Sequence, residues 1–199
     1  MIVLYHGGKE HYRYPSPNLQ RVCRKFVKSG ADLVVCQHSH CIGCEEKYLD
    51  GTIVYGQGNF LFDDSESEFW QTSLLIRIDD NFQVSYIPLV KNGNNVQIAS
   101  ATASDRILKD FFARSEEIKR AGEIEKKYSE FAKKMIDDYL FRISGMGKSF
   151  AFRVLNKITR RKYGRWKLKR IFGKQQFLSV QNVLECEAHR ELFEEGLKR

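Results

Sequence analysis

Three short apolar runs in the first third of the chain predict β-strands. They cover residues 2–5, 32–36 and 52–55, and each is followed by polar or glycine residues. Runs of this length, bounded by turn-forming residues, are typical of strands buried in a sheet. We therefore expect the polar residues after each run to lie in loops at the strand ends.

A helical pattern separates the first two runs. Ser16 is a favourable N-cap, Pro17 a favourable first helical residue, and Gly30 a favourable stop. Between them, apolar residues recur at helical spacing on one face, namely Leu19, Val22, Cys23, Phe26 and Val27. A strand–helix–strand unit with tight connections has parallel strands. The loops that follow residues 5 and 36 should therefore emerge at the same edge of the sheet.

The remainder of the chain changes from strands to helices. Residues 70–79 and 82–90 predict an antiparallel hairpin, and residues 91–95 a loop. Apolar stripes at helical spacing follow at 107–112 and 124–139, and further helices are expected near 149–162 and 180–198. The predicted fold class is α/β, with a sheet-containing domain at residues 1–100 and a helical, basic region at residues 101–199.

Side chains that can bind metals follow the predicted strands. His6 comes directly after the first strand, and His38 and His40 follow the second on a segment that we expect to be extended. Parallel strands would bring these imidazoles together, and such donors suit zinc, manganese or iron. Asn59 is a further donor or substrate contact, or else a turn-forming residue. Glu10 is a carboxylate that can orient an imidazole, or else a solvated loop charge.

Three stretches carry a resemblance to a known family. They are HGGKEH at residues 6–11, GADLVVCQHSHCIGCEEKY at 30–48 and GTIVYGQGNFLFD at 51–63. Together they resemble the second half of the bacterial capsule-synthesis CapA (PGA-cap) family, which is associated with poly-γ-glutamate capsules and shares the calcineurin-like metallophosphatase fold. The resemblance implies a partial metallophosphatase-like β-sandwich with flanking helices and metal ligands at His6, His38 and His40. Asn59 and Glu10 would be catalytic residues beside a di-metal centre that stabilises a phosphoryl-type transition state.

The chain departs from the family pattern in two places. Gln37 precedes His38 where many phosphoesterases have glycine, and the family's earlier Gly-Asp, acidic and Asn-Asn-His motifs have no counterpart before His6. We therefore expect the C-terminal part of a longer protein, whose missing N-terminal half supplies the remaining carboxylates for the metals. Any enzyme activity would be that of a metallophosphoesterase-like hydrolase completed by that half.

The cysteines and the apolar pattern of the sequence bear on the expected cellular location. The 199 residues include five cysteines, an odd number, and two of them lie within apolar patterns, which indicates buried thiols in a reducing compartment. Cys41 and Cys44 form a C-x-x-C pair, so a structural zinc there is the alternative. The sequence has no apolar run of membrane-spanning length and no signal-peptide pattern at residue 1. The expected location is cytoplasmic or peripheral to the cell envelope.

The net charge of +8 is unevenly distributed. Residues 142–174 contain no Asp or Glu and twelve basic residues: Arg142, Lys148, Arg153, Lys157, Arg160, Arg161, Lys162, Arg165, Lys167, Lys169, Arg170 and Lys174. Aromatic residues are interleaved with them, so the alternative function is a non-catalytic module that binds an anionic polymer or a membrane surface. Specific nucleic-acid binding is not expected, because the sequence has no reader motif. The competing interpretation is a solvated helix face paired with the acidic residues 185–195.

Overall fold

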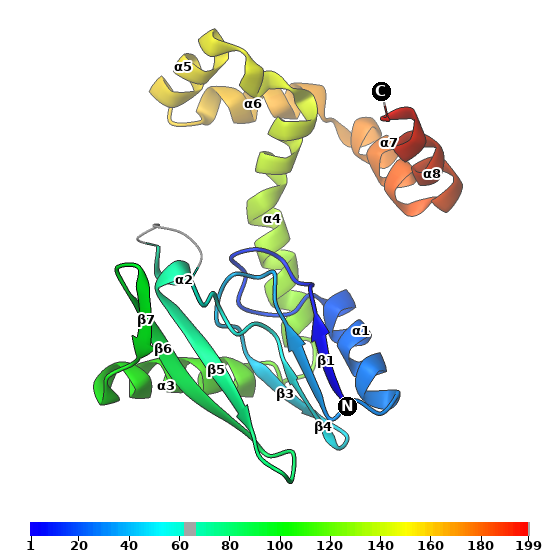
Figure 1. The fold of residues 1–199 in the computed structure, drawn as a ribbon. Coiled ribbons are helices and arrows are strands. Elements are labelled where there is room, and N and C mark those ends of the chain that lie inside the picture. The colour runs from blue at the N-terminus through cyan, green and yellow to red at the C-terminus, as the bar shows by residue number, and fades with distance from the viewer. Residues whose placement is uncertain (62–66, 199) are drawn as a thin grey trace. The chain divides into compact units, whose positions relative to one another are not determined.

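The computed structural model describes residues 1–61 and 67–198 (Figure 1). The chain divides into two compact units, Met1–Phe131 and Ala132–Arg199. Both sheets lie in the first unit, and the described part of the second is helical. The last two residues of the GTIVYGQGNFLFD stretch, 62 and 63, lie outside the described residues.

The first sheet contains the three predicted strands and one more. Its order is β1-β2-β4-β3, formed by Ile2–Tyr5, Leu33–Cys36, Gly51–Val54 and Glu45–Tyr48. β1 pairs parallel with β2, and β2 with β4, which confirms the predicted parallel strand–helix–strand unit. β3 pairs antiparallel with β4 and was not predicted. The carboxyl ends of β1, β2 and β4 therefore share one edge.

Helix α1, Pro17–Lys28, connects β1 to β2 and covers one face of this sheet (Figure 1). Its N-cap is the predicted one, because the Ser16 hydroxyl oxygen accepts a hydrogen bond from the Leu19 amide at 3.0 Å. The buried face of α1 packs against the inner residues of the strands, in a core that includes Leu19, Cys23, Val27, Val34 and Ile53. The spacing of apolar residues in the sequence therefore predicted both the helix and the face that it buries.

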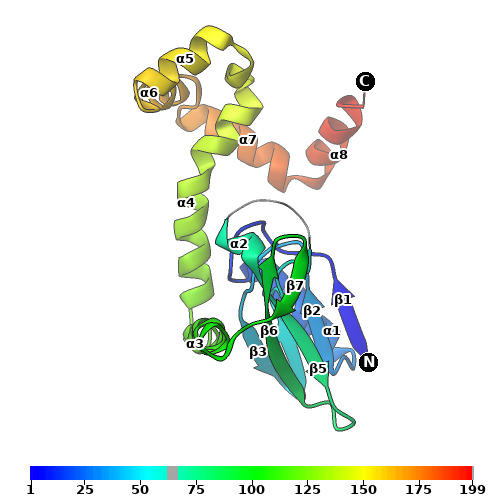
Figure 2. The same ribbon diagram turned by 60° about the vertical axis from the view of Figure 1, so that its left-hand side comes forward.

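A second, antiparallel sheet follows the short helix α2, Glu68–Gln71. Its order is β5-β6-β7, formed by Thr72–Ile78, Val84–Asn92 and Asn95–Ile98 (Figure 2). The predicted hairpin is confirmed, although residues 70 and 71 belong to α2. The loop predicted at 91–95 is wrong, because β6 continues to Asn92 and a tight turn leads into β7.

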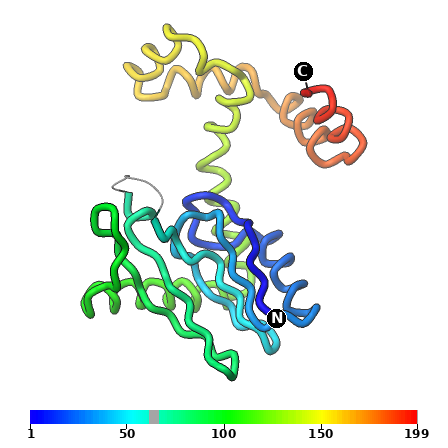
Figure 3. The backbone as a smooth tube through the Cα atoms, viewed as in Figure 1, coloured from blue at the N-terminus to red at the C-terminus, as the bar shows by residue number. Residues whose placement is uncertain are grey.

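Helix α3, Ala101–Glu117, completes the core of the first unit. Ile107 and Phe111 of α3 are buried with Leu33 and Val54 of the first sheet and Leu74 of the second. The two sheets and α3 therefore share one apolar core. The units divide at residues 131/132 rather than at residue 100, because α3 and the start of α4 pack with the sheets. The backbone trace in Figure 3 follows this path.

The second unit begins within α4, Glu123–Ser144. The predicted break at 144–149 is present as the left-handed Gly145 and the 3-10 turn Met146–Lys148. It is followed by α5, Phe150–Ile158; α6, Lys162–Ile171; α7, Lys174–Glu185; and α8, Glu187–Gly196. Left-handed Arg160 and Arg161 end the expected 149–162 helix early and separate α5 from α6. None of the described helices has the length and apolarity needed to cross a bilayer.

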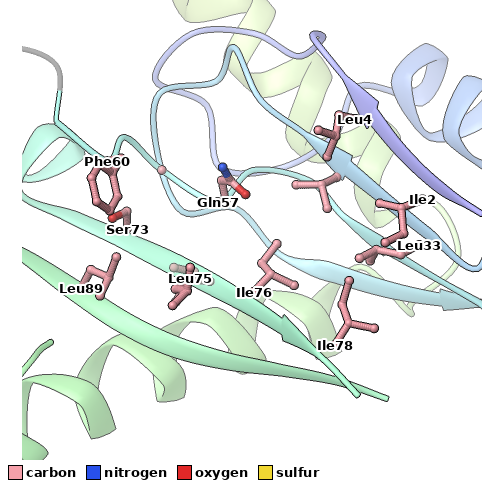
Figure 4. A pocket seen from close by; sticks show the side chains of 13 residues that line it. Ile2, Leu4, Leu33, Gln57, Phe60, Ser73, Leu75, Ile76, Ile78 and Leu89 are labelled. Atoms are coloured by element: carbon pink, nitrogen blue, oxygen red, sulfur yellow. The ribbon is translucent and has the colours of Figure 1, made fainter. Parts of the chain in front are cut away.

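An apolar groove lies between the first sheet and β5 (Figure 4). It has a volume of about 220 Å³ and is lined mainly by leucine and isoleucine side chains of β1, β2 and β5. Leu4 of the edge strand β1 is 71% exposed there, and Phe60 is 70% exposed. Exposed large apolar side chains along an edge strand can pair or pack with further polypeptide.

Candidate metal site

The predicted ligands lie in three loops at the carboxyl edge of the first sheet. Residues 6–16 follow β1, residues 37–44 follow β2, and residues 55–61 follow β4. The first two loops are joined by a hydrogen bond from the His11 amide to the Ser39 carbonyl oxygen at 2.8 Å. The second and third are joined by one from the Gly43 amide to the Gly56 carbonyl oxygen at 3.0 Å. The backbone therefore holds the loops together without help from the imidazoles.

The histidine pair after β2 has a conformation that the sequence did not reveal. The sequence predicts an extended segment at His38 and His40, but both lie in the left-handed region, with φ of 63° and 54°. Between them, the Ser39 amide donates to the Gln37 carbonyl oxygen at 2.6 Å, and Ser39 is buried. Left-handed backbone is uncommon outside glycine and is concentrated at functional sites. A tight turn, rather than strand alternation, brings these two side chains to the same side.

Glu10 lies with this pair. A carboxylate oxygen of Glu10 and one ring nitrogen each of His38 and His40 all lie within 4.8 Å of one another. Glu10 is exposed and the two histidines are partly buried, so the cluster is open to solvent. Two imidazoles and one carboxylate form a donor set that zinc, manganese and iron accept. The chemistry of these three residues therefore fits one divalent ion.

His6 borders this cluster. Its ring centroid is 4.8 Å from that of His38, and the His38 and His40 centroids are 5.9 Å apart. The predicted convergence of imidazoles from β1 and β2 at one edge is thus present. The trio that shares a possible ion position is nevertheless Glu10, His38 and His40, with His6 beside it.

Asn59 orients the imidazole of His40. Its side-chain nitrogen donates to the His40 carbonyl oxygen at 3.2 Å, so its amide oxygen is the atom that faces the ring. That oxygen lies 2.8 Å from Nδ1 of His40. An amide oxygen only accepts hydrogen bonds, so Nδ1 carries the proton and Nε2 carries the lone pair. Fixing this tautomer is the usual role of the second partner of a metal-binding histidine.

An aromatic wall beside the site was missed by the sequence reasoning. The ring of His11 stacks on Phe69, with centroids 5.3 Å apart, and lies edge-on to Trp70 at 5.4 Å. Trp70 also lies 5.1 Å from the His40 ring. Arg13 covers Phe69 at 4.7 Å. These residues come from the loop after β1 and from α2, and no local pattern connects them.

The C-x-x-C pair lies in the loop after β2, directly after His40. Cys41 and Cys44 are buried and free, and burial raises the pKa of both thiols. Among the described residues, neither cysteine belongs to a group of three or more side chains that could hold a metal ion. Cys23 and Cys36 are also buried and free, with their sulfur atoms 3.4 Å apart.

Comparisons with known proteins converge on capsule synthesis. Residues 1–64 match the family model described as bacterial capsule synthesis protein PGA_cap. The capsule biosynthesis protein CapA of Bacillus anthracis is 28% identical over 111 residues, which cover 54% of this chain and 27% of that protein. The PGA biosynthesis protein CapA of Bacillus subtilis strain 168 is 33% identical over 63 residues, 32% of this chain and 17% of that protein.

The matched region contains the whole candidate ligand cluster. Glu10, His38, His40 and their partner Asn59 all lie within residues 1–64. The aligned segments span about a quarter or less of the two relatives. The first 64 residues therefore match the bacterial capsule synthesis PGA_cap family, and both relatives are capsule or PGA biosynthesis proteins by name.

Proposed function

We propose that this chain acts in capsule or poly-γ-glutamate biosynthesis through a divalent metal site held by Glu10, His38 and His40. The observation that carries the proposal is the position of this donor set, within 4.8 Å, inside the segment that matches the family. The printed names of the relatives, a capsule and a PGA biosynthesis protein, support the biological role. The metallophosphatase-like fold implied by the resemblance supports a hydrolase-type site.

The residues of the site have distinct roles in this proposal. A bound divalent ion would supply Lewis-acid polarisation of a phosphoryl or carbonyl oxygen. Asn59 holds His40 in the tautomer that presents Nε2. His6, beside His38, is placed to contact substrate or to bind a second ion together with carboxylates from outside the described cluster. Trp70 lies against the His40 ring and His11 against Trp70, so both form an aromatic wall on one side of the site.

Metal analysis tests the site. We expect the purified chain to bind about one zinc or manganese ion, and the double variant His38→Ala/His40→Ala to lose it, because a single carboxylate is a weak site. His189→Ala is the matched control, since this exposed histidine lies on α8. Unchanged metal binding in the double variant would refute the proposed site.

We also propose that the site is completed by additional polypeptide of the same fold, packed on the groove in Figure 4. The edge position of β1 and the exposure of Leu4 and Phe60 support this, because added strands pair with such edges. Co-expression with the N-terminal remainder of the Bacillus subtilis relative should give a complex, and Leu4→Lys should weaken it. Leu49→Lys is the control, an exposed leucine in the β3–β4 turn. A complex indifferent to Leu4→Lys would place the partner elsewhere.

A further inference from the structure

The second unit carries a positively charged surface that the candidate metal site does not explain. The twelve basic residues of the 142–174 stretch lie on the end of α4, on α5 and α6, on the connections between them, and at the first residue of α7. Within the described residues, two of them form ion pairs with carboxylates of α4: Arg161 with Asp138, and Arg165 with Asp137 at 3.2 Å. Among the described residues, no ion pair joins this stretch to the acidic residues 185–195. The interpretation of the basic face as the partner of the last helix therefore lacks support.

Helix α5 exposes one stripe of large apolar side chains to solvent. Phe150, Val154 and Ile158 recur at every fourth residue and so form one stripe, and Phe150 and Ile158 are each 72% exposed. The opposite face of α5 packs within the unit, because Phe152 is buried against Phe141 and Tyr163. The exposed stripe is thus a second apolar face, not the one that packs within the unit.

Helix α6 combines positive charge with an exposed aromatic side chain. Trp166 is 50% exposed, and the guanidinium carbon of Arg170 lies 4.5 Å from its ring centroid. Lys162 and Lys169 flank Trp166 on the same helix face and are exposed. A tryptophan surrounded by cationic side chains is typical of segments that lie at the boundary between water and lipid headgroups.

We propose that α5 and α6 form a peripheral attachment surface for an anionic phospholipid bilayer. Charge complementarity provides the attraction. Each basic residue near an anionic surface contributes to the binding free energy, and no acidic residue in the stretch opposes it. The exposed apolar side chains favour a bilayer over a soluble polyanion. A soluble polymer would be bound by the cationic side chains alone. Phe150 and Ile158 add to the binding free energy only where an apolar phase such as the lipid interior can bury them.

Vesicle co-sedimentation of the full chain tests the proposal. We expect binding to vesicles of phosphatidylglycerol and phosphatidylcholine in equal parts, and much weaker binding to phosphatidylcholine alone. Binding should weaken as salt is added, because exposed charges are screened. The emission of Trp166 should shift to shorter wavelength on binding, and Trp166→Phe identifies this signal against Trp70.

Two variants separate the charged and apolar contributions. Lys157→Gln/Arg160→Gln/Lys169→Gln should weaken binding roughly 100-fold, at about fivefold per basic residue removed. Its control, Lys28→Gln/Lys109→Gln/Lys126→Gln, changes the net charge equally at exposed positions of the first unit and should leave binding within a few-fold. Phe150→Ser/Ile158→Ser keeps every charge and should also weaken vesicle binding. Far-UV circular dichroism verifies that each variant is folded.

The outcomes decide between lipid and polymer. Loss of vesicle binding in both variants supports the bilayer surface. Equal binding to poly-γ-glutamate or DNA in solution, unaffected by Phe150→Ser/Ile158→Ser, would overturn it in favour of a polyanion site. Absence of salt-sensitive vesicle binding would also overturn it. The result is independent of the proposed metal site, since zinc binding by His38 and His40 is measured separately on the same protein.

Discussion

Asn59 is the side chain on which the orientation of His40 depends, so Asn59→Ala is the sharpest test of the candidate site. The substitution removes both contacts, the amide oxygen 2.8 Å from Nδ1 and the amide nitrogen 3.2 Å from the carbonyl oxygen. The imidazole can then rotate and exchange tautomers. Loss of such a partner weakens metal binding about 10- to 100-fold, which corresponds to roughly 1.4 to 2.8 kcal/mol.

The stability of the fold should change much less. Asn59 is partly exposed, so water replaces part of what is lost, and we expect a cost of about 1 kcal/mol or less in the free energy of unfolding. Zinc affinity is measured by competition with a chromophoric chelator, and stability by urea denaturation of the metal-free protein. A larger effect on zinc affinity than on stability is the expected signature.

Two further variants make the test decisive. Asn59→Asp keeps an acceptor opposite Nδ1 and adds negative charge beside the imidazole, so zinc affinity should equal or exceed that of the wild type. Asn92→Ala removes an amide that donates to Gln97 at 3.3 Å in the β6–β7 hairpin and should leave zinc affinity unchanged. The reasoning is refuted if Asn59→Ala binds zinc like the wild type, or if Asn59→Asp is as weak as Asn59→Ala.

Two other predictions concern the loops and the first unit. Gly56→Ala should cost about 3 kcal/mol in unfolding free energy, because φ is 128° and a Cβ would lie 2.6 Å from the Cys41 carbonyl oxygen. Gly93→Ala, at φ of 57° with open space, should cost only about 1 kcal/mol; equal costs measured by urea denaturation would contradict this. Glu117 accepts a hydrogen bond from Tyr14 at 2.7 Å, which lowers the pKa of Glu117 below its ordinary 4.5. A lowered folded-state pKa adds stability above pH 4.5 that is lost as pH falls through the folded value. Glu117→Gln should thus be less stable at pH 7, with the difference shrinking below pH 4.5 in denaturation curves; a constant difference would contradict the assignment.

The local pattern of the sequence determined the frame of the site. Apolar runs specified β1, β2 and β4, and the spacing of Leu19, Cys23 and Val27 with the Ser16 cap specified α1. These features depend on residues close together in the chain. The chirality of a strand–helix–strand unit then forces parallel strands. Convergence of His6 and His38 at one edge therefore followed from the sequence alone.

Strand β3 shows where this reasoning stops. Its sequence, EEKY, is polar and does not alternate like a half-buried strand. It is a strand because β4 offers an unpaired edge, and because Glu46 accepts hydrogen bonds from Arg24 of α1 and from Tyr55, the latter at 2.5 Å. Pairing energy and contacts from elsewhere in the fold override a weak local preference.

The ligand set itself was decided by tertiary structure. The sequence predicted His6, His38 and His40 as the metal ligands. In the structure, His38 and His40 lie in a left-handed turn and form the ligand cluster with Glu10, and His6 lies beside it. The wall of His11 and Trp70 likewise joins a residue of the loop after β1 to a residue of α2. Hydrophobic periodicity reports which face of an element is buried, whereas the direction of a loop side chain depends on backbone hydrogen bonds between loops, such as that from His11 to Ser39. Such bonds exist only after the sheet has aligned the strand ends, so only the folded chain could reveal them.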